Sequence, residues 1–314
     1  MAADLAAVEA ALRDEIHGDP AVVAAPMADL FAAGGKRLRP ALVLLSAKNG
    51  HYDLDKLTPA AMAVELTHAA TLVHDDVIDR SAVRRGRPTV AAALGDEPAI
   101  VIGDFYFAKA YEHAARTELT EVVAILARAV MEICAGEVRQ QEIRYRYSTS
   151  IDEYMRRIDA KTATLLAACC DIGALLAGLP KPQRESLNAY GRLLGLAFQI
   201  ADDVLDYLGS EGEIGKPIGQ DIAEGFATLP LMIALQDESA ANRLAKVLQD
   251  GRKLSSKEAG EVVNIVRESG APQRALERAR EHATAASRRL DSLPTGDARD
   301  ALAALTDYVV TRKL

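Results

Sequence analysis

LVHDDVIDR, residues 72–80, places three aspartates within five positions, directly after an apolar run. QIADDVLDY, residues 199–207, repeats this spacing in the same kind of setting. On a helix, carboxylates four residues apart project from one face, where like charges destabilise the helix by roughly 0.2–0.5 kcal/mol per pair. A chain that accepts this cost twice is expected to neutralise the carboxylates with bound cations.

The aspartates of these two clusters suit hard divalent ions, which prefer oxygen ligands, and magnesium is usually held by a few carboxylates together with substrate phosphates. Two other interpretations remain open at this point. The clusters could be solvated helix ends, although their matched spacing beside apolar runs argues against that. The His74–Asp75 pair could belong to a helical metal-dependent phosphohydrolase, but the chain has only six histidines and its second cluster is all aspartate.

The bulk composition bounds the class of protein. The chain has 314 residues, 49% of them hydrophobic, with a formal net charge of -8 and a pI near 5.4. Net acidity argues against a nucleic-acid-binding protein, whose affinity depends on a basic face. The three cysteines include an adjacent pair and suggest no disulfide framework, so a cytoplasmic location is expected. The most apolar window, residues 163–179, is short and contains Asp171, so no stable membrane insertion is expected.

Helical signals dominate the whole chain. Alternating strand patterns are almost absent, and no Asn-Gly or Asp-Gly pair joins two of them as a hairpin turn. Thr58-Pro59 is expected to begin the helix that carries the first aspartate cluster, and Pro40 to begin the one before it. The stretch LPKPQ, residues 179–183, separates two long helices, and the glycine-rich residues 209–225 are expected to form a loop. With no repeat and no clear linker, residues 1–314 are predicted to form a single all-α domain.

Basic groups are interleaved with the acidic clusters. GGKRLRP, residues 34–40, combines two glycines with three cations, and RRGRPT, residues 84–89, follows the first cluster closely. Lys161 and Lys216 add two further cations near the second cluster. Arginine matches the geometry of phosphate oxygens, and glycine allows the backbone to approach them. Since no catalytic serine elbow, Walker-type loop or Cys/His pair is present, these groups suggest a site for metal-bridged diphosphates.

The order of these motifs resembles that of the trans-isoprenyl diphosphate synthases, or polyprenyl synthetases, over nearly the whole chain. The matching stretches are GGKRLRP, ELTHAATLVHDDVIDRSAVRRGRPT, GDFYF, KTA, FQIADDVLDY and GKPIGQDIAEGFATLP. The resemblance implies an orthogonal all-α helical bundle with a deep central cavity, of the isoprenoid synthase type, in a homodimer. It also implies the reaction: an allylic diphosphate held by several Mg²⁺ ions ionises, isopentenyl diphosphate attacks the allylic cation, and a proton is lost.

The resemblance assigns residues by position. Asp75 and Asp79 should bind metal from one side and Asp202 from the other, with Asp76, Asp203 and Asp206 in support. Isopentenyl diphosphate should be held by Lys36, Arg39, His68 and Arg85. The allylic diphosphate should face Arg84, Lys161, Thr162, Gln199 and Lys216, of which Lys161, Gln199 and Lys216 are the candidate catalytic residues.

One position departs from the family pattern. Many members carry a lysine after the glycine in the segment that is EGFATLP here, residues 224–230, whereas this chain has Phe226. The lysine normally adds a cation near the allylic diphosphate, so that contact is in doubt in this chain. Lys161 and Lys216 are the candidates to supply the charge instead.

The residues that precede the first cluster on its helix should limit product length, since the family's product grows along that helix. Thr71, Ala70, Thr67 and Ala63 occupy this face and none is aromatic, so a medium- or long-chain product is expected. Ala63 would lie roughly 18 Å from Asp75 along a helix. The aromatic stretch at residues 105–107, and Phe107 in particular, could close the cavity and leave geranylgeranyl diphosphate as the product.

Two further functions remain as alternatives. A terpene cyclase shares the helical fold, but its second metal motif usually mixes acids with Asn, Ser or Thr, and it needs no GGKRLRP pocket for a second diphosphate. A non-catalytic subunit of a heteromeric synthase tends to lose aspartates from one cluster, and this chain keeps all six.

Overall fold

The architecture is all-α, as expected. The computed structural model describes residues 1–32, 34–209 and 219–311, which are almost entirely helical. Their only strands are the two-residue β1 (Val83–Arg84) and β2 (Arg87–Pro88), which pair with each other. In this part of the chain, no helix combines the length and apolar character needed to cross a membrane.

The described residues group into two compact units, each assembled from separate stretches of chain. Unit 1 comprises Met1–Val130, Ala168–Asn188 and Leu293–Arg299, and unit 2 comprises Met131–Ala167, Ala189–Ser292 and Asp300–Leu314. The expectation of a single domain stays a prediction.

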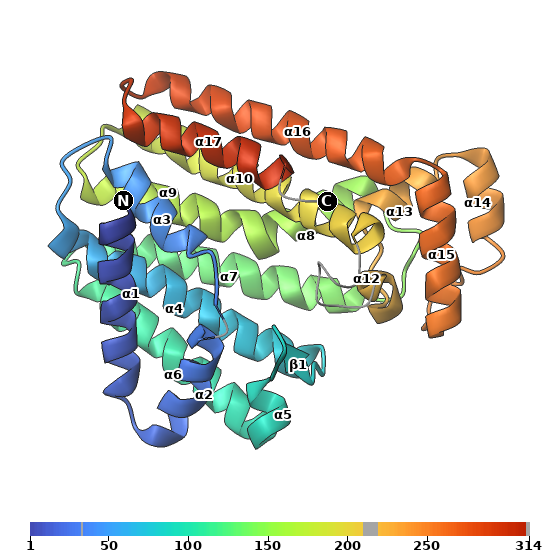
Figure 1. Ribbon diagram of the computed structural model, residues 1–314, viewed down its shortest axis with the longest axis horizontal. Helices are drawn as coiled ribbons and strands as arrows, with labels where there is room; N and C mark the ends of the chain where they lie inside the picture. The colour runs from blue at the N-terminus through green and yellow to red at the C-terminus, as the bar shows by residue number, and fades with distance from the viewer. Residues whose placement is uncertain (33, 210–218, 312–314) are drawn as a thin grey trace. The chain divides into compact units, whose positions relative to one another are not determined.

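Unit 1 contains the first aspartate cluster. Its helices (Figure 1) are α1 (Ala2–His17), α2 (Ala21–Ala32), α3 (Leu38–Ala47), α4 (Leu54–Ile78), α5 (Val90–Leu94) and α6 (Asp96–Ala115), with parts of α7 (Thr120–Glu142), α9 (Thr164–Leu176), α10 (Lys181–Leu208) and α17 (Asp297–Thr311). The break between α9 and α10 falls at LPKPQ, as expected.

The helix that carries the first cluster, α4, begins one turn earlier than the sequence suggested. Asp53 is its N-cap and accepts hydrogen bonds from the backbone N–H groups of Asp55 and Lys56. Thr58 lies inside the helix, and its hydroxyl donates to the Leu54 carbonyl at 2.8 Å. The expected start at Thr58-Pro59 is therefore wrong, because the aspartate upstream caps the helix and Pro59 is accommodated within it.

α6 packs closely against α4 (Figure 1) because it has a glycine at the contact. A Cβ atom built on Gly103 would lie 2.1 Å from Nε2 of His74 on α4. His74 Nε2 also lies 3.0 Å from the Ile100 carbonyl oxygen, one turn before that glycine. The glycine of the GDFYF stretch therefore makes room for a histidine ring adjacent to Asp75.

A tight hairpin follows the first aspartate cluster. Val83 pairs with Pro88 and Arg84 with Arg87, which leaves Arg85 and Gly86 as a two-residue turn. Both turn residues have positive φ, 51° and 76°, the pattern of a type I′ turn. The expectation of no hairpin is wrong here, because arginine, rather than Asn or Asp, takes the first turn position before the glycine.

Unit 2 contains the second aspartate cluster, near the C-terminal end of α10. Beside its parts of α7, α9, α10 and α17, it has α8 (Ile151–Ile158), η1 (Asp159–Ala163), α12 (Gln220–Glu224), α13 (Leu229–Ala234), α14 (Glu238–Leu244), α15 (Ser256–Glu268), α16 (Ala271–Arg289) and η2 (Leu290–Ser292). Tyr154, Tyr190 and Tyr207 are fully buried in its core. Of the expected loop at residues 209–225, the described part includes α12.

Candidate active site

The second aspartate of the first cluster is bound by the protein itself. Arg84, in β1, donates from Nε to both oxygens of Asp76 at 2.9 and 3.0 Å, and its Nη2 lies 2.8 Å from Oδ1. Asp76 is 2% exposed, so the guanidinium compensates the burial of its charge. Asp75 and Asp79, in the last turn of α4 and at its C-cap, are half-buried.

His68 lies on α4 within the electrostatic reach of four arginines. Burial first, and then the positive charges of Arg39, Arg85, Arg84 and Arg37, hold the pKa of this imidazole well below its ordinary value. The ring is therefore neutral at physiological pH and can both donate and accept a hydrogen bond. This excess of positive charge around a neutral donor suits a ligand that carries phosphate.

A hydrogen bond joins the two segments that carry Lys36, Arg39 and Arg85, three of the residues expected to hold isopentenyl diphosphate. Arg85 Nη1 donates to the carbonyl oxygen of Gly34, 51 positions earlier in the chain. Lys36 is exposed in the intervening loop, and Arg39 is half-buried on α3. The Nε of Arg39 is buried without a hydrogen-bond partner among the described residues. The GGKRLRP and RRGRPT stretches thus come together at Gly34 and Arg85.

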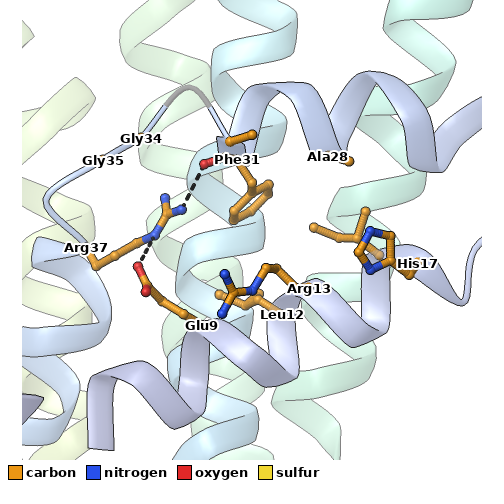
Figure 2. Close-up of a pocket in the computed structure, with 11 residues that line it drawn as sticks. Glu9, Leu12, Arg13, His17, Ala28, Phe31, Gly34, Gly35 and Arg37 are labelled. Carbon is orange, nitrogen blue, oxygen red and sulfur yellow. Dashed lines mark hydrogen bonds and ion pairs between the residues drawn. The ribbon is translucent and has the colours of Figure 1, made fainter. Parts of the chain in front are cut away.

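Arg37 fixes the loop that carries Lys36. Its Nε and Nη1 donate to Glu9 and Glu65, each at 3.0 Å, and its Nη2 donates to the Phe31 carbonyl at 3.1 Å. Figure 2 shows this guanidinium at the edge of a pocket of about 420 Å³, whose apolar wall includes Leu12 and Phe31. Because Glu65 is 5% exposed, Arg37 is committed to an internal ion pair.

The residues expected to govern chain length are closely packed. Ala63, Thr67 and Ala70 are at most 1% exposed, and the half-buried Thr71 donates its hydroxyl to the His68 carbonyl at 2.7 Å.

The nearby aromatic side chains of α6 differ in direction. Tyr106 is fully buried and donates to Asp19 at 3.2 Å. The Phe107 ring lies 5.5 Å from the imidazole of His74, next to the aspartate cluster. Of the two, Phe107 is therefore the one placed near the acidic end of α4.

Four side chains of unit 2 form a continuous hydrogen-bonded series. The Thr162 hydroxyl and Oε1 of Gln199 lie 2.7 Å apart, Gln199 Nε2 donates to Oδ1 of Asp203 at 2.8 Å, and the Tyr154 hydroxyl donates to Oδ2 at 2.7 Å. Burial raises the pKa of Asp203 to about 6, against the opposing effect of these hydrogen bonds. Its neighbour Asp202 is exposed. The second cluster therefore repeats the first: the second aspartate of each pair is buried and bound, and the first is more accessible.

The third aspartate of the second cluster has a structural role. Asp206 accepts the backbone N–H groups of Gln220 and Asp221, each at 3.1 Å, and so caps the N-terminus of α12. Burial, together with the charges of Asp206 and Asp203, raises the pKa of Asp221 well above its ordinary value. Asp206 thus links α10 to the segment that carries EGFATLP.

Lys161 lies in a π-helical turn, η1, between α8 and α9. Its ammonium lies 2.7 Å from Oε2 of Glu137, whose other oxygen, Oε1, accepts a hydrogen bond from the Gln141 amide at 3.0 Å. π-Helical turns occur frequently at functional sites, because the extra residue redirects the side chains. Lys216, the other candidate lysine, lies outside the described residues.

The comparison with protein families decides between the interpretations. The model of the Polyprenyl synthetase family matches residues 20–266. The chain belongs to this family. It is accordingly a prenyltransferase, and the phosphohydrolase and cyclase interpretations are set aside.

Relatives and solved structures of this polyprenyl synthetase cover almost all of it. Heptaprenyl diphosphate synthase component 2 of Geobacillus stearothermophilus is 39% identical over 309 residues, 98% of this chain and 96% of the relative. A short chain isoprenyl diphosphate synthase of Methanothermobacter thermautotrophicus is 38% identical over 290 residues, 90% and 88% of the two chains. The crystal structure of a Caulobacter crescentus polyprenyl synthase, complexed with calcium and isoprenyl diphosphate, has a TM-score of 0.93 at 38% identity, covering 99% and 95%.

The donor set of this polyprenyl synthetase fits a hard divalent ion completed by substrate. In the described residues, no three His, Cys, Asp or Glu side chains gather closely enough to hold a metal by themselves. Magnesium keeps several waters and typically takes one or two carboxylates plus substrate phosphates, so a preformed cage is not required. Asp75 and Asp79 in unit 1, and separately Asp202 in unit 2, carry carboxylate oxygens, the donor type that such an ion prefers.

Sequence reasoning missed the residues that hold the assigned ones in place. Arg37 and Glu65 were not singled out, because their spacing of 28 residues gives no local signal. Glu137, the partner of Lys161, lies on a different helix and was likewise not visible. Tyr154 does carry a signal, since it precedes the KTA stretch on an amphipathic helix, but its bond to Asp203 requires the fold.

Proposed function

We propose that this prenyltransferase condenses isopentenyl diphosphate with an allylic diphosphate, farnesyl or geranylgeranyl, in a magnesium-dependent reaction. The supporting observation is the common design of the two acidic clusters. In each, the second aspartate is buried and hydrogen-bonded, Asp76 by Arg84 and Asp203 by Gln199 and Tyr154, and the first is more accessible. This division leaves Asp75 and Asp202, with Asp79, as the proposed metal ligands.

Bound magnesium would neutralise the charge that develops on the departing diphosphate. Arg84, Lys161, Thr162, Gln199 and Lys216 are proposed to orient the allylic diphosphate, and Lys36, Arg39, His68 and Arg85 to hold isopentenyl diphosphate. The allylic carbon–oxygen bond breaks, the isopentenyl double bond forms the new carbon–carbon bond, and a proton leaves to the released diphosphate. Since His68 is neutral, it can donate a hydrogen bond to a phosphate without adding to the four neighbouring positive charges.

We also propose a medium- or long-chain all-trans product, with geranylgeranyl diphosphate as the alternative. Supporting the longer product, the assigned face of α4 carries only Ala and Thr at positions 63, 67, 70 and 71. The aromatic that could stop elongation is Phe107, beside His74. The test supplies labelled isopentenyl diphosphate with geranyl, farnesyl or geranylgeranyl primer and sizes the products by mass spectrometry. Extension past twenty carbons supports the longer product, and a stop at twenty identifies a geranylgeranyl synthase.

Removal of one proposed metal ligand from either cluster is expected to abolish this turnover. Asp75→Ala and Asp202→Ala should each lower the rate to the detection limit and leave the helical circular dichroism spectrum unchanged, because neither carboxylate is fully buried. Asp300→Ala, at an exposed position of α17, is the matched control and should retain wild-type turnover. Full activity in either cluster variant would contradict the metal assignment.

A second candidate is a subunit that needs a different partner, because the relative from Geobacillus stearothermophilus is named component 2 of its synthase. We nevertheless propose a catalytic homodimer in the cytoplasm, since both clusters are complete and the three cysteines are free thiols. Exposed apolar side chains lie on α6, Ile100 and Val101, and on α7, Met131 and Val138. Light scattering should give twice 33.6 kDa for the active protein, whereas an inactive protein would favour the second candidate.

A further inference from the structure

Phe226, the departure from the family lysine, lies between two arginines. The ring is 8% exposed, with the guanidinium carbons of Arg144 and Arg157 5.2 and 6.0 Å from its centroid. Both distances are within the range of cation–π attraction. Both arginines also hold the backbone on either side of the ring: Arg144 Nε donates to the Glu224 carbonyl at 2.8 Å, and Arg157 Nη2 to the Ala227 carbonyl at 2.9 Å.

Arg157 is an unusual buried cation. It is 7% exposed and forms no salt bridge with any described residue. Its guanidinium carbon also lies 5.3 Å from the ring centroid of Tyr154, the residue whose hydroxyl donates to Asp203. Burying a charge without a direct ion pair is costly, so the surroundings must compensate it in another way.

The groups that compensate the charge of Arg157 are the Tyr154 and Phe226 rings and the Ala227 carbonyl. Through Tyr154, Arg157 also reaches the second aspartate cluster, because the tyrosine hydroxyl donates to Oδ2 of Asp203 at 2.7 Å. Arg157 therefore contacts the ring of Tyr154, one of the direct hydrogen-bond partners of Asp203.

We propose that Arg157 is a positioning residue for the second aspartate cluster, acting through the rings of Tyr154 and Phe226. It orients the tyrosine that binds Asp203, fixes the EGFATLP segment at Ala227, and places a buried positive charge beside position 226. This inference rests on the proposed function. A lysine at position 226 would put its ammonium beside the guanidinium groups of Arg144 and Arg157. An aromatic ring at 226 is therefore compatible with Arg157, whereas a lysine is not.

The test substitutes positions 157 and 226, first singly and then together. Arg157→Met should lower kcat/KM for the allylic diphosphate by about 10–100-fold, the range for residues that support metal ligands, and leave KM for isopentenyl diphosphate unchanged. Phe226→Lys, although it introduces the family residue, should also lower activity, because of repulsion from Arg144 and Arg157. The double variant should recover about tenfold over either single one, since the lysine then replaces the missing charge without a like-charged neighbour on that side.

A binding measurement separates positioning from folding. Calorimetric titration of inorganic diphosphate in the presence of magnesium should show weakened binding in Arg157→Met and recovered binding in the double variant. The matched control, Arg156→Met, should keep the thermal unfolding midpoint of the wild-type protein. That control removes an exposed arginine from the position immediately before Arg157 on α8. Higher allylic affinity in Phe226→Lys alone, or strictly additive losses in the double variant, would overturn the proposal. Failure of the proposed function is distinguishable, because the wild-type protein would then show no turnover.

Discussion

At the scale of single residues, the structure separates side chains that can meet a substrate from those that hold them. The sequence identified the aspartates and cations by type and spacing, because these chemical groups are visible in the sequence. It could not identify Arg37, Glu137 or Arg157, because their roles depend on partners that lie far away in the chain. It also could not show that His68 would be buried and surrounded by arginines, both of which lower the pKa of its imidazole.

The neutral state of His68 predicts a specific pH dependence of stability. Its folded pKa is depressed, so below about pH 6.5 the unfolded chain binds a proton that the folded chain does not. Stability from this group is therefore full above that pH and falls as the pH decreases, by at most about 1.4 kcal/mol per pH unit. Urea unfolding at pH 7.5 and 5.5 should show a smaller loss for His68→Gln than for wild type. His51→Gln removes an exposed histidine and is the control; equal losses in wild type and His68→Gln would contradict the prediction.

At the scale of the elements, helix content followed from composition and apolar periodicity, but three details did not. α4 has two candidate start signals five residues apart, and the upstream Asp53 is the N-cap in the structure. The Arg85-Gly86 turn lacks the usual sequence signal of a hairpin. The π-helical turn η1 has no sequence signal, since DAKTA is compatible with an ordinary α-helix. Its extra residue is stabilised by packing, and the glycines of neighbouring helices provide the room.

Gly195 of α10 tests how strictly this turn must be placed. A Cβ atom there would lie 2.5 Å from the Cα of Ala163, at the end of η1, and backbone cannot move aside easily. Gly195→Ala should therefore destabilise the protein by about 1–3 kcal/mol, as overpacking does. It should also lower turnover, because η1 carries Lys161 and Thr162.

Gly260→Ala on α15 is the matched control for this substitution. Nothing lies within 4 Å of its added methyl group, so the exchange should stabilise the helix by up to about 1 kcal/mol. Chemical denaturation and steady-state kinetics of the two variants measure the effects. Equal stability of the two proteins would show that the contact at η1 is not tight.

At the scale of the whole molecule, the division into two units does not coincide with loops between helices. α7, α9, α10 and α17 each contribute residues to both units, so unfolding one unit would shorten helices on which the other depends. We therefore predict one cooperative thermal transition, as a single domain requires. The calorimetric enthalpy of unfolding should equal the van't Hoff enthalpy. Two resolved transitions, or a ratio of calorimetric to van't Hoff enthalpy well above one, would show that the units unfold independently.

The contact between Gly103 and His74 also constrains how this chain can evolve. Any side chain at position 103 would collide with the imidazole, whereas a smaller residue at position 74 collides with nothing and only opens space. Substitutions at the two positions are therefore tolerated in one order, with the histidine lost first. Sequence lineages that pass through the opposite order should be missing among functional descendants, a form of historical contingency imposed by a single methyl-sized gap beside the first aspartate cluster.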